Sequence, residues 1–377
     1  MPLAAPRLAR LALVSLAVSI TACSSYVPFD SVSDLRAKFD TALGAKALEV
    51  EVPFELSADL LAWLDTHLSK TTDEKSRVEQ VLNYIFDDLN LRYSLSPTYD
   101  AMGTYQSHRG NCLSFVNLFV GIARHQRLAP FYVEVTDYQR WSYRDGMVVS
   151  QGHIVAGLNL NGGMKTYDFL PYKAKSYRGF KPIDDLAAAA HYYNNLGAEA
   201  LMAGEADKAR NLLELANRLQ PRFVKAINNL GVLLARRGEL AAAEATYRRG
   251  LEVEPANVAL LNNLAQVCQR QGRDQEAATI LGKIANENNT NPFFFVYRAE
   301  QALSKGDTEQ AMKMMVEALR RDSEAPEVQL GFVKVYMAIG DLEKARHHLE
   351  RALRLDATNQ EALRFAKMLQ TAPEDKK

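Results

Sequence analysis

The C-terminal half of the chain is built around the sequence AINNLGVLLARRGELAAAEA, residues 226–245. Apolar and small residues recur every three to four positions on both sides of Gly238, which predicts two amphipathic helices joined at that glycine. The glycine returns every 34 residues, and an alanine follows each one by five: Gly204, Gly238, Gly272, Gly306 and Gly340, with Ala209, Ala243, Ala277, Ala311 and Ala345. A period of this length, made of paired helices, predicts a solenoid of stacked repeats.

This pattern resembles the tetratricopeptide repeat. The resemblance covers five repeats over residues 190–359, and Leu196-Gly197 and Leu230-Gly231 match the Leu-Gly of the family's first helix. It implies an all-α, right-handed solenoid whose concave face, lined by the first helix of each repeat, binds a protein or peptide. Residues 360–377 are expected to form a capping helix and a tail.

Two features of the repeats bear on ligand binding. Asn195, Asn229 and Asn263 recur at one repeat position, so their amides could hydrogen-bond an extended peptide backbone along the groove. The alternative is that asparagine is merely tolerated there. The aromatic residues 293–295 and Tyr297 cannot all face one side of a helix, so part of this run could form an exposed docking patch, although core packing is the favoured interpretation.

The N-terminus has the pattern of a targeting segment. Arg7 and Arg10 precede an apolar run that is too short to span a bilayer, and the run ends in Ile20-Thr21-Ala22-Cys23. This ending resembles a bacterial lipobox, which implies a signal peptide over residues 1–22, a lipid on Cys23 and, because Ser24 follows, an outer-membrane lipoprotein facing the periplasm. An ordinary secretory signal is the alternative. Residues 23–72 are interpreted as anchor, linker and N-terminal helical segment.

Residues 73–184 lack the 34-residue period and predict an α+β domain. A helix is expected over 73–89, and a loop then leads to Asn111-Cys112, where a second apolar stripe begins, so Cys112 is predicted to open a helix. Three β-rich segments follow, and the turn signal Asn161-Gly162-Gly163 joins the last two. The segments are 131–136, 147–160 and 164–170.

This domain contains the parts of a nucleophilic triad. Unpaired N–H groups at a helix start favour the thiolate of Cys112, and His153 on a strand could deprotonate the thiol and later protonate a leaving amine. Asp168 on the next strand could fix the imidazole, although the strand register cannot be read from the sequence. Gln106, on the incoming loop, is a candidate oxyanion donor beside the Cys112 N–H. Each of these residues could instead be structural.

The residues Arg109-Gly110-Asn111-Cys112, then His153, then Tyr167-Asp168, resemble the core of the transglutaminase-like superfamily over roughly residues 75–172. The resemblance implies a papain-like fold with nucleophile, base and orienting acid at Cys112, His153 and Asp168. Ser114 and Phe169 depart from the commonest family pattern, which leaves the reaction open. Bacterial members include peptidases, amide hydrolases and acyl transferases, and some are inactive.

The composition narrows the kinds of partner and cofactor that the protein is expected to bind. The 45 basic and 45 acidic residues cancel, with a pI near 7.1, so nucleic acid is not an expected partner. Three cysteines are too few for a disulfide scaffold or a four-ligand zinc site. The sequence also lacks a phosphate-binding loop, so we expect neither a metal nor a cofactor. The sequence thus favours a periplasmic Cys-His-Asp enzyme that hydrolyses or transfers amide acyl groups. The alternatives are a non-catalytic assembly scaffold and an accessory to polymer export.

Overall fold

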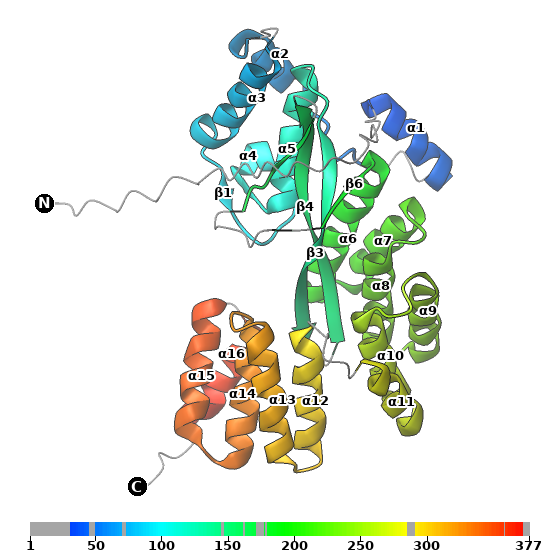
Figure 1. The fold of residues 1–377 in the computed structure, drawn as a ribbon, viewed down its shortest axis with the longest axis vertical. Coiled ribbons are helices and arrows are strands. Elements are labelled where there is room, and N and C mark those ends of the chain that lie inside the picture. Colours follow the sequence, from blue (N-terminus) through cyan, green and yellow to red (C-terminus); the bar gives the residue numbers. More distant parts are fainter. Residues whose placement is uncertain are drawn as a thin grey trace, which may run out of the picture. The chain divides into compact units, whose positions relative to one another are not determined.

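The computed structural model describes residues 31–44, 50–69, 73–144, 147–160, 163–170, 177, 179–284, 291–357 and 359–371 (Figure 1). The chain divides into two compact units. The first consists of Met1–Arg140 and Gln151–Leu233, and the second consists of Trp141–Ser150 and Leu234–Lys377. The predicted signal peptide and Cys23 lie outside the described residues. None of the described helices is both long and apolar enough to cross a membrane.

Among the described residues up to His125, the first unit contains these helical segments (Figure 1): α1 (Val32–Leu43), α2 (Ala58–His67), α3 (Glu74–Asn83), the π-helical turn Tyr84–Asp88, α4 (Ala101–Ser107) and α5 (Cys112–His125). A side-chain oxygen caps the start of each α-helix among them, and these caps come from Ser31, Ser57, Asp73, Asp100 and Asn111. The predicted helix over 73–89 is therefore confirmed as α3 with its π-helical continuation.

The described residues form a four-stranded sheet with its strands in the order β5-β4-β3-β6. Its strands are β3 (Phe131–Arg144), β4 (Met147–Leu160), β5 (Gly163–Tyr167) and β6 (Phe180–Ile183). β4 pairs antiparallel with β5, with Ala156 opposite Tyr167, and β3 pairs antiparallel with β6. The predicted β-rich segments are confirmed as strands, but two of their bounds were wrong. β3 continues beyond 136 to Arg144, and β5 ends at Tyr167, so Asp168 follows the strand directly. A separate parallel pair joins β1 (Arg92–Tyr93) to β2 (Arg109–Gly110).

The C-terminal half is helical, as the period predicts. Its helices are α6 (Asp185–Ala203), α7 (Ala206–Leu219), α8 (Val224–Arg236), α9 (Leu240–Val253), α10 (Val258–Arg270), α11 (Asp274–Ile284), α12 (Pro292–Ser304), α13 (Thr308–Arg321), α14 (Pro326–Ile339), α15 (Leu342–Leu355) and α16 (Gln360–Thr371). The periodic glycines take φ between 76° and 87°, a left-handed conformation that ends the first helix of each repeat. The periodic alanines are fully buried where paired helices meet.

The first repeat is part of the first compact unit, because the division between the units falls within α8. Buried residues of α6, including Ala187–Ala190, belong to the same apolar cluster as α5. At the start of α6, Asp185 accepts two hydrogen bonds of 2.8 Å from Arg124 at the end of α5, and both side chains are largely buried. Because the two side chains form a bidentate pair, their charges can be buried together.

Candidate active site

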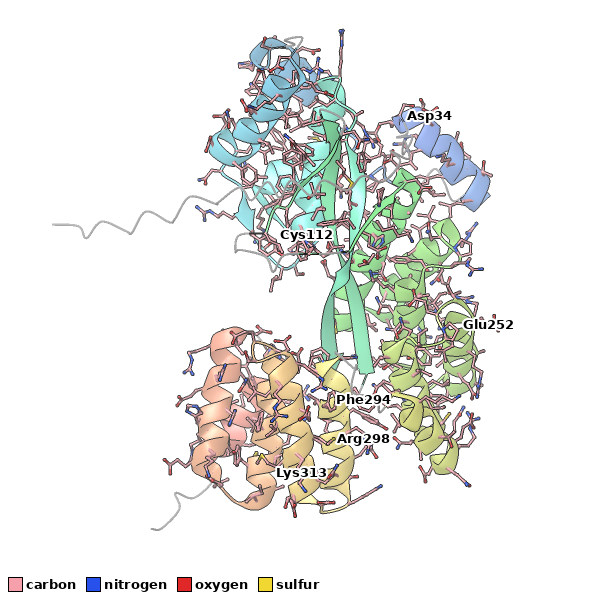
Figure 2. The ribbon with its side chains drawn as sticks, viewed as in Figure 1. Asp34, Cys112, Glu252, Phe294, Arg298 and Lys313 are labelled. Carbon is pink, nitrogen blue, oxygen red and sulfur yellow. The ribbon has the colours of Figure 1, made fainter. Side chains whose placement is uncertain are left out.

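Cys112, labelled in Figure 2, is the first residue of α5, as predicted. The residue is partly exposed. The helix begins there because Asn111 has an extended backbone and its Oδ1 accepts the Ser114 N–H at 3.1 Å. On the other side of Asn111, Gly110 pairs with Tyr93 in the small parallel sheet. The sulfur is therefore held at a helix N-terminus, where unpaired N–H groups favour a negative charge.

The structure brings Cys112, His153 and Asp168 together. His153 lies in β4 with 1% of its surface exposed, and its ring forms a hydrogen bond with the Cys112 side chain. Its Nε2 lies 3.1 Å from Asp168 Oδ2, which leaves Nδ1 as the ring nitrogen for the sulfur. The pairing of β4 with β5 carries Asp168 back to His153, and the Leu170 N–H donates to Asp168 Oδ1 at 3.1 Å.

The charges of this group favour a thiolate beside an imidazolium. Burial alone raises the pKa of the Cys112 thiol, but the charge on His153 and hydrogen bonds from the His153 ring and the Ile154 N–H lower that pKa below its ordinary value. Burial alone lowers the pKa of His153, but the Cys112 charge and the hydrogen bond to Asp168 raise it to about 10. Such a thiolate is the nucleophilic form of cysteine at neutral pH.

Three other residues lie near this group in sequence or in space. Gln106, predicted on the incoming loop, lies instead in the last turn of α4 and is exposed; its role as an oxyanion donor stays a prediction. Between it and Cys112, His108 adopts a left-handed backbone, and its Nδ1 lies 2.8 Å from the Leu89 carbonyl oxygen. Sequence reasoning missed Tyr177, whose ring centroid lies 5.4 Å from that of His153. Tyr177 stands in a segment without apolar periodicity, so no pattern indicated it.

The asparagines proposed for peptide binding are buried side chains, so the structure does not place them on an open surface. Asn229 Nδ2 donates to Asn194 Oδ1 at 2.8 Å. One turn before Asn195 and Asn229, the side chains of His191 and Lys225 lie against Gly152 of β4, where an added Cβ would come within 2.8 Å of Lys225 Nζ. Peptide binding by Asn195, Asn229 and Asn263 stays a prediction.

The aromatic run of α12 packs in the interior. Phe293, Phe294, Phe295 and Tyr297 are all buried, so core packing is confirmed over an exposed docking patch. Arg321 Cζ lies 3.9 Å from the centroid of the Phe295 ring, which adds a cation–π contact. Figure 2 labels Phe294 in this helix.

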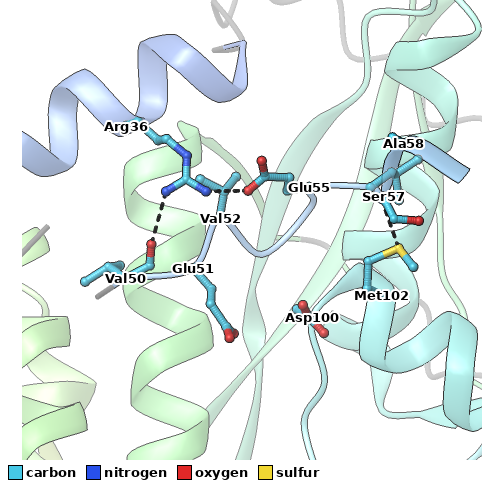
Figure 3. Close-up of a pocket in the computed structure, with 10 residues that line it drawn as sticks. Arg36, Val50, Glu51, Val52, Glu55, Ser57, Ala58, Asp100 and Met102 are labelled. Carbon is cyan, nitrogen blue, oxygen red and sulfur yellow. Dashed lines mark hydrogen bonds and ion pairs between the residues drawn. The ribbon is translucent and has the colours of Figure 1, made fainter. Parts of the chain in front are cut away.

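A separate cleft of about 510 Å³ opens in the first unit, between residues 50–58 and α4 (Figure 3). Arg36, Glu51, Glu55 and Asp100 contribute charge to its lining, and Arg36 Nη2 lies 2.5 Å from Glu55 Oε2. The described residues that line the cleft do not include Cys112, His153 or Asp168. The cleft is therefore distinct from the thiol site.

The chain thus combines an α+β domain with helical repeats. In the α+β domain a cysteine opens a helix, a histidine lies on a strand, and an aspartate directly follows the neighbouring strand. Comparison with protein families gives the same division. Residues 62–162 match the transglutaminase-like superfamily, and residues 194–252, 228–291 and 302–375 match the tetratricopeptide repeat. The chain carries a transglutaminase-like domain followed by tetratricopeptide repeats. The first match includes Cys112 and His153 and ends before Asp168.

Similar solved structures cover about half of the chain. TTC0263, a thermophilic TPR protein of Thermus thermophilus, is 19% identical over 48% of this chain and 99% of its own, with a TM-score of 0.43. The Pseudomonas aeruginosa protein pilF is 23% identical over 49% of this chain and 86% of its own, with a TM-score of 0.37. YrrB, described as a TPR protein with an unusual peptide-binding site, is 17% identical over 47% and 92%, with a TM-score of 0.30. No curated protein matches the chain.

Proposed function

We propose that the protein is a thiol enzyme that acts on amide or peptide carbonyls. Cys112 is the nucleophile, His153 is the general base and acid, and Asp168 orients the imidazole. The observation that carries this proposal is the line of hydrogen bonds from the Cys112 sulfur through His153 to Asp168, at the N-terminus of a buried helix. Each partner in this line supplies what a thiol nucleophile needs: a nearby base, and a carboxylate that fixes the base.

The reaction proceeds in two steps. The Cys112 thiolate attacks the carbonyl carbon, the C–N bond breaks, and His153 gives its proton to the leaving amine, which leaves a thioester. His153 then takes a proton from water, whose oxygen attacks the thioester and releases a carboxylic acid while the sulfur departs. A primary amine in place of water yields a new amide. The Cys112 N–H, unpaired at the helix start, is suited to receive the negative oxygen of each tetrahedral intermediate.

The repeats support binding to a protein or peptide, and we propose that this ligand carries or delivers the substrate. We further propose, from the sequence around Cys23, that the protein is a lipoprotein of the outer membrane that faces the periplasm. Lipid attachment would bury acyl CH₂ groups, each worth about 0.8 kcal/mol. Mass spectrometry of the mature N-terminus tests this: a diacylated or triacylated Cys23 is expected, and an unmodified N-terminus at another residue would contradict it.

The enzyme proposal is tested with unfolded casein as the acyl donor, with and without a fluorescent primary amine. Release of ammonia or of new N-termini reports cleavage of the C–N bond, which hydrolysis and transfer share. Fluorescence in the casein reports transfer. We expect a signal from the wild-type protein and from the control Cys268→Ala, and none from Cys112→Ala. Turnover retained in Cys112→Ala would refute the mechanism. A wild-type Cys112 that is no more reactive than a free thiol would favour a non-catalytic assembly scaffold.

A further inference from the structure

The loop that leads to Cys112 is held by a carboxylate from the first repeat. Glu199 lies on α6, and its oxygens accept the Thr98 N–H at 2.9 and 3.1 Å. The Thr98 hydroxyl also lies 2.6 Å from Glu199 Oε1. Because the two residues are 101 positions apart, this contact joins the repeat helix to a loop of the thiol domain.

From Thr98 the contacts continue to the residue before Cys112. Asn111 Nδ2 donates to Thr98 Oγ1 at 2.6 Å, and Asn111 Oδ1 accepts the Ser114 N–H that caps α5. The direction of this chain is set at Asn111, because its amide NH₂ can only donate a hydrogen bond and therefore points at a lone pair of Thr98 Oγ1. The Thr98 hydroxyl must then donate to Glu199, and its lone pairs face the Asn111 NH₂. This orientation turns the Asn111 oxygen toward the helix start.

Water is largely excluded from the middle of this chain. Thr98 is 3% exposed and Asn111 is 7% exposed, so a lost bond there would leave a buried polar group unpaired. A second bond supports the same turn, since the Tyr99 N–H donates to the Ser114 hydroxyl at 2.8 Å. α6 itself is fixed to the domain at other points as well, by the Asp185–Arg124 pair and by the Tyr193 hydroxyl, which donates to the Glu51 carbonyl at 2.8 Å.

We propose that Glu199 is a positioning residue for Cys112, acting through Thr98 and Asn111 on the cap of α5. Its catalytic meaning rests on the proposed function, but the positioning itself does not. The first repeat then helps to hold the helix start at Cys112 in position, in addition to any role in ligand binding. Glu199 does not touch the sulfur, so its removal alters the geometry of the helix start while leaving His153 and Asp168 in place.

The test compares variants that remove the hydrogen bonds between Glu199, Thr98 and Asn111 with variants that keep them. Glu199→Met and Thr98→Val remove the acceptor and the hydroxyl at similar volume, whereas Thr98→Ser keeps the hydroxyl. Glu214→Met, at an exposed position on α7, is the matched control. Alkylation of Cys112 by iodoacetamide across the pH range is the first readout. We expect Glu199→Met and Thr98→Val to slow it about threefold to tenfold at neutral pH and to move its midpoint upward, with Thr98→Ser and Glu214→Met near wild type.

Hydrogen exchange of the peptide covering residues 109–118 is the second readout, and it does not depend on an activated thiol. Faster exchange in Glu199→Met and Thr98→Val, but not in Thr98→Ser or Glu214→Met, supports the positioning role. Unchanged exchange and unchanged alkylation in the first two variants would overturn it. If Glu199→Met or Thr98→Val fails to fold, Glu199→Gln, which keeps one acceptor oxygen, is expected to show a smaller effect in the same direction. A wild-type Cys112 with ordinary reactivity would count against the enzyme proposal alone.

Discussion

Two cysteines on helices have opposite surroundings. Cys112 opens α5 and is hydrogen-bonded by the His153 ring and the Ile154 N–H, which together with the His153 charge lower its pKa against the effect of burial. Cys268 lies in the last turn of α10 with 0% of its surface exposed, and burial raises its pKa. The helix start offers N–H groups to a thiolate, whereas the last turn offers carbonyl oxygens that oppose it. Position along the helix and a charged partner therefore distinguish a nucleophile from a structural thiol.

The largest effect is expected from removing the charged partner. In His153→Ala the thiolate of Cys112 loses the imidazolium and its hydrogen bond, so alkylation of Cys112 at pH 6 should fall by about tenfold to a hundredfold. The rate is measured by peptide mass spectrometry, and Cys268 in the same sample is the control. An unchanged Cys112 rate would mean that the helix start alone sets its reactivity. The charge of His153 would then not explain the difference between Cys112 and Cys268.

A smaller effect is expected at the residue that orients the base. Asp168→Asn keeps a side chain of the same size but removes the negative charge that holds a proton on His153. The pKa of His153, raised to about 10 in the native protein, should fall toward its ordinary value, so the imidazolium is lost at a lower pH. Titration of the His153 ring by NMR measures this directly. A His153 pKa that stays near 10 in Asp168→Asn would assign the shift to Cys112 alone.

The smallest effect is expected at the helix caps. Each of the two cysteine-bearing helices has an asparagine cap, so the two caps can be compared. Asn111 caps α5 before Cys112, and Asn257 caps α10, where its Oδ1 accepts the Leu260 N–H at 3.1 Å. Asn111→Ala and Asn257→Ala should each cost about 1 kcal/mol in the free energy of unfolding. Urea denaturation measures this cost, and only Asn111→Ala should also slow the alkylation of its cysteine. Equal effects on both cysteines would show that the caps act on stability alone.

Local features of the sequence predicted much of this arrangement. The start of α5 could be predicted because Asn111 is a strong capping residue and an apolar stripe follows it. The repeats could be predicted because glycine and alanine recur at fixed spacing, and the periodic glycines do take the left-handed backbone. Both patterns depend on residues within one or two helical turns of each other.

The features that could not be predicted depend on contacts between distant segments. The pairing of Ala156 with Tyr167, which carries Asp168 to His153, is a choice of strand register, and a slip of one residue would turn every side chain to the other face. The Glu199–Thr98 contact and the burial of Asn195 depend on where α6 packs, and a helical pattern does not specify its neighbours. The sequence therefore indicated the residues of the site but not the long-range contacts that position them.

Cys112 is expected to be a thiolate at neutral pH, and the pH dependence of its alkylation measures this. Wild-type protein is treated with iodoacetamide from pH 5 to pH 10, and the rates at Cys112 and Cys268 are compared with that of N-acetylcysteine. Because only the thiolate reacts and the pKa of Cys112 is lowered, its rate should stay high well below the ordinary thiol pKa of about 8.5. A Cys112 rate that follows the profile of N-acetylcysteine would show that Cys112 is an ordinary thiol and not an activated nucleophile.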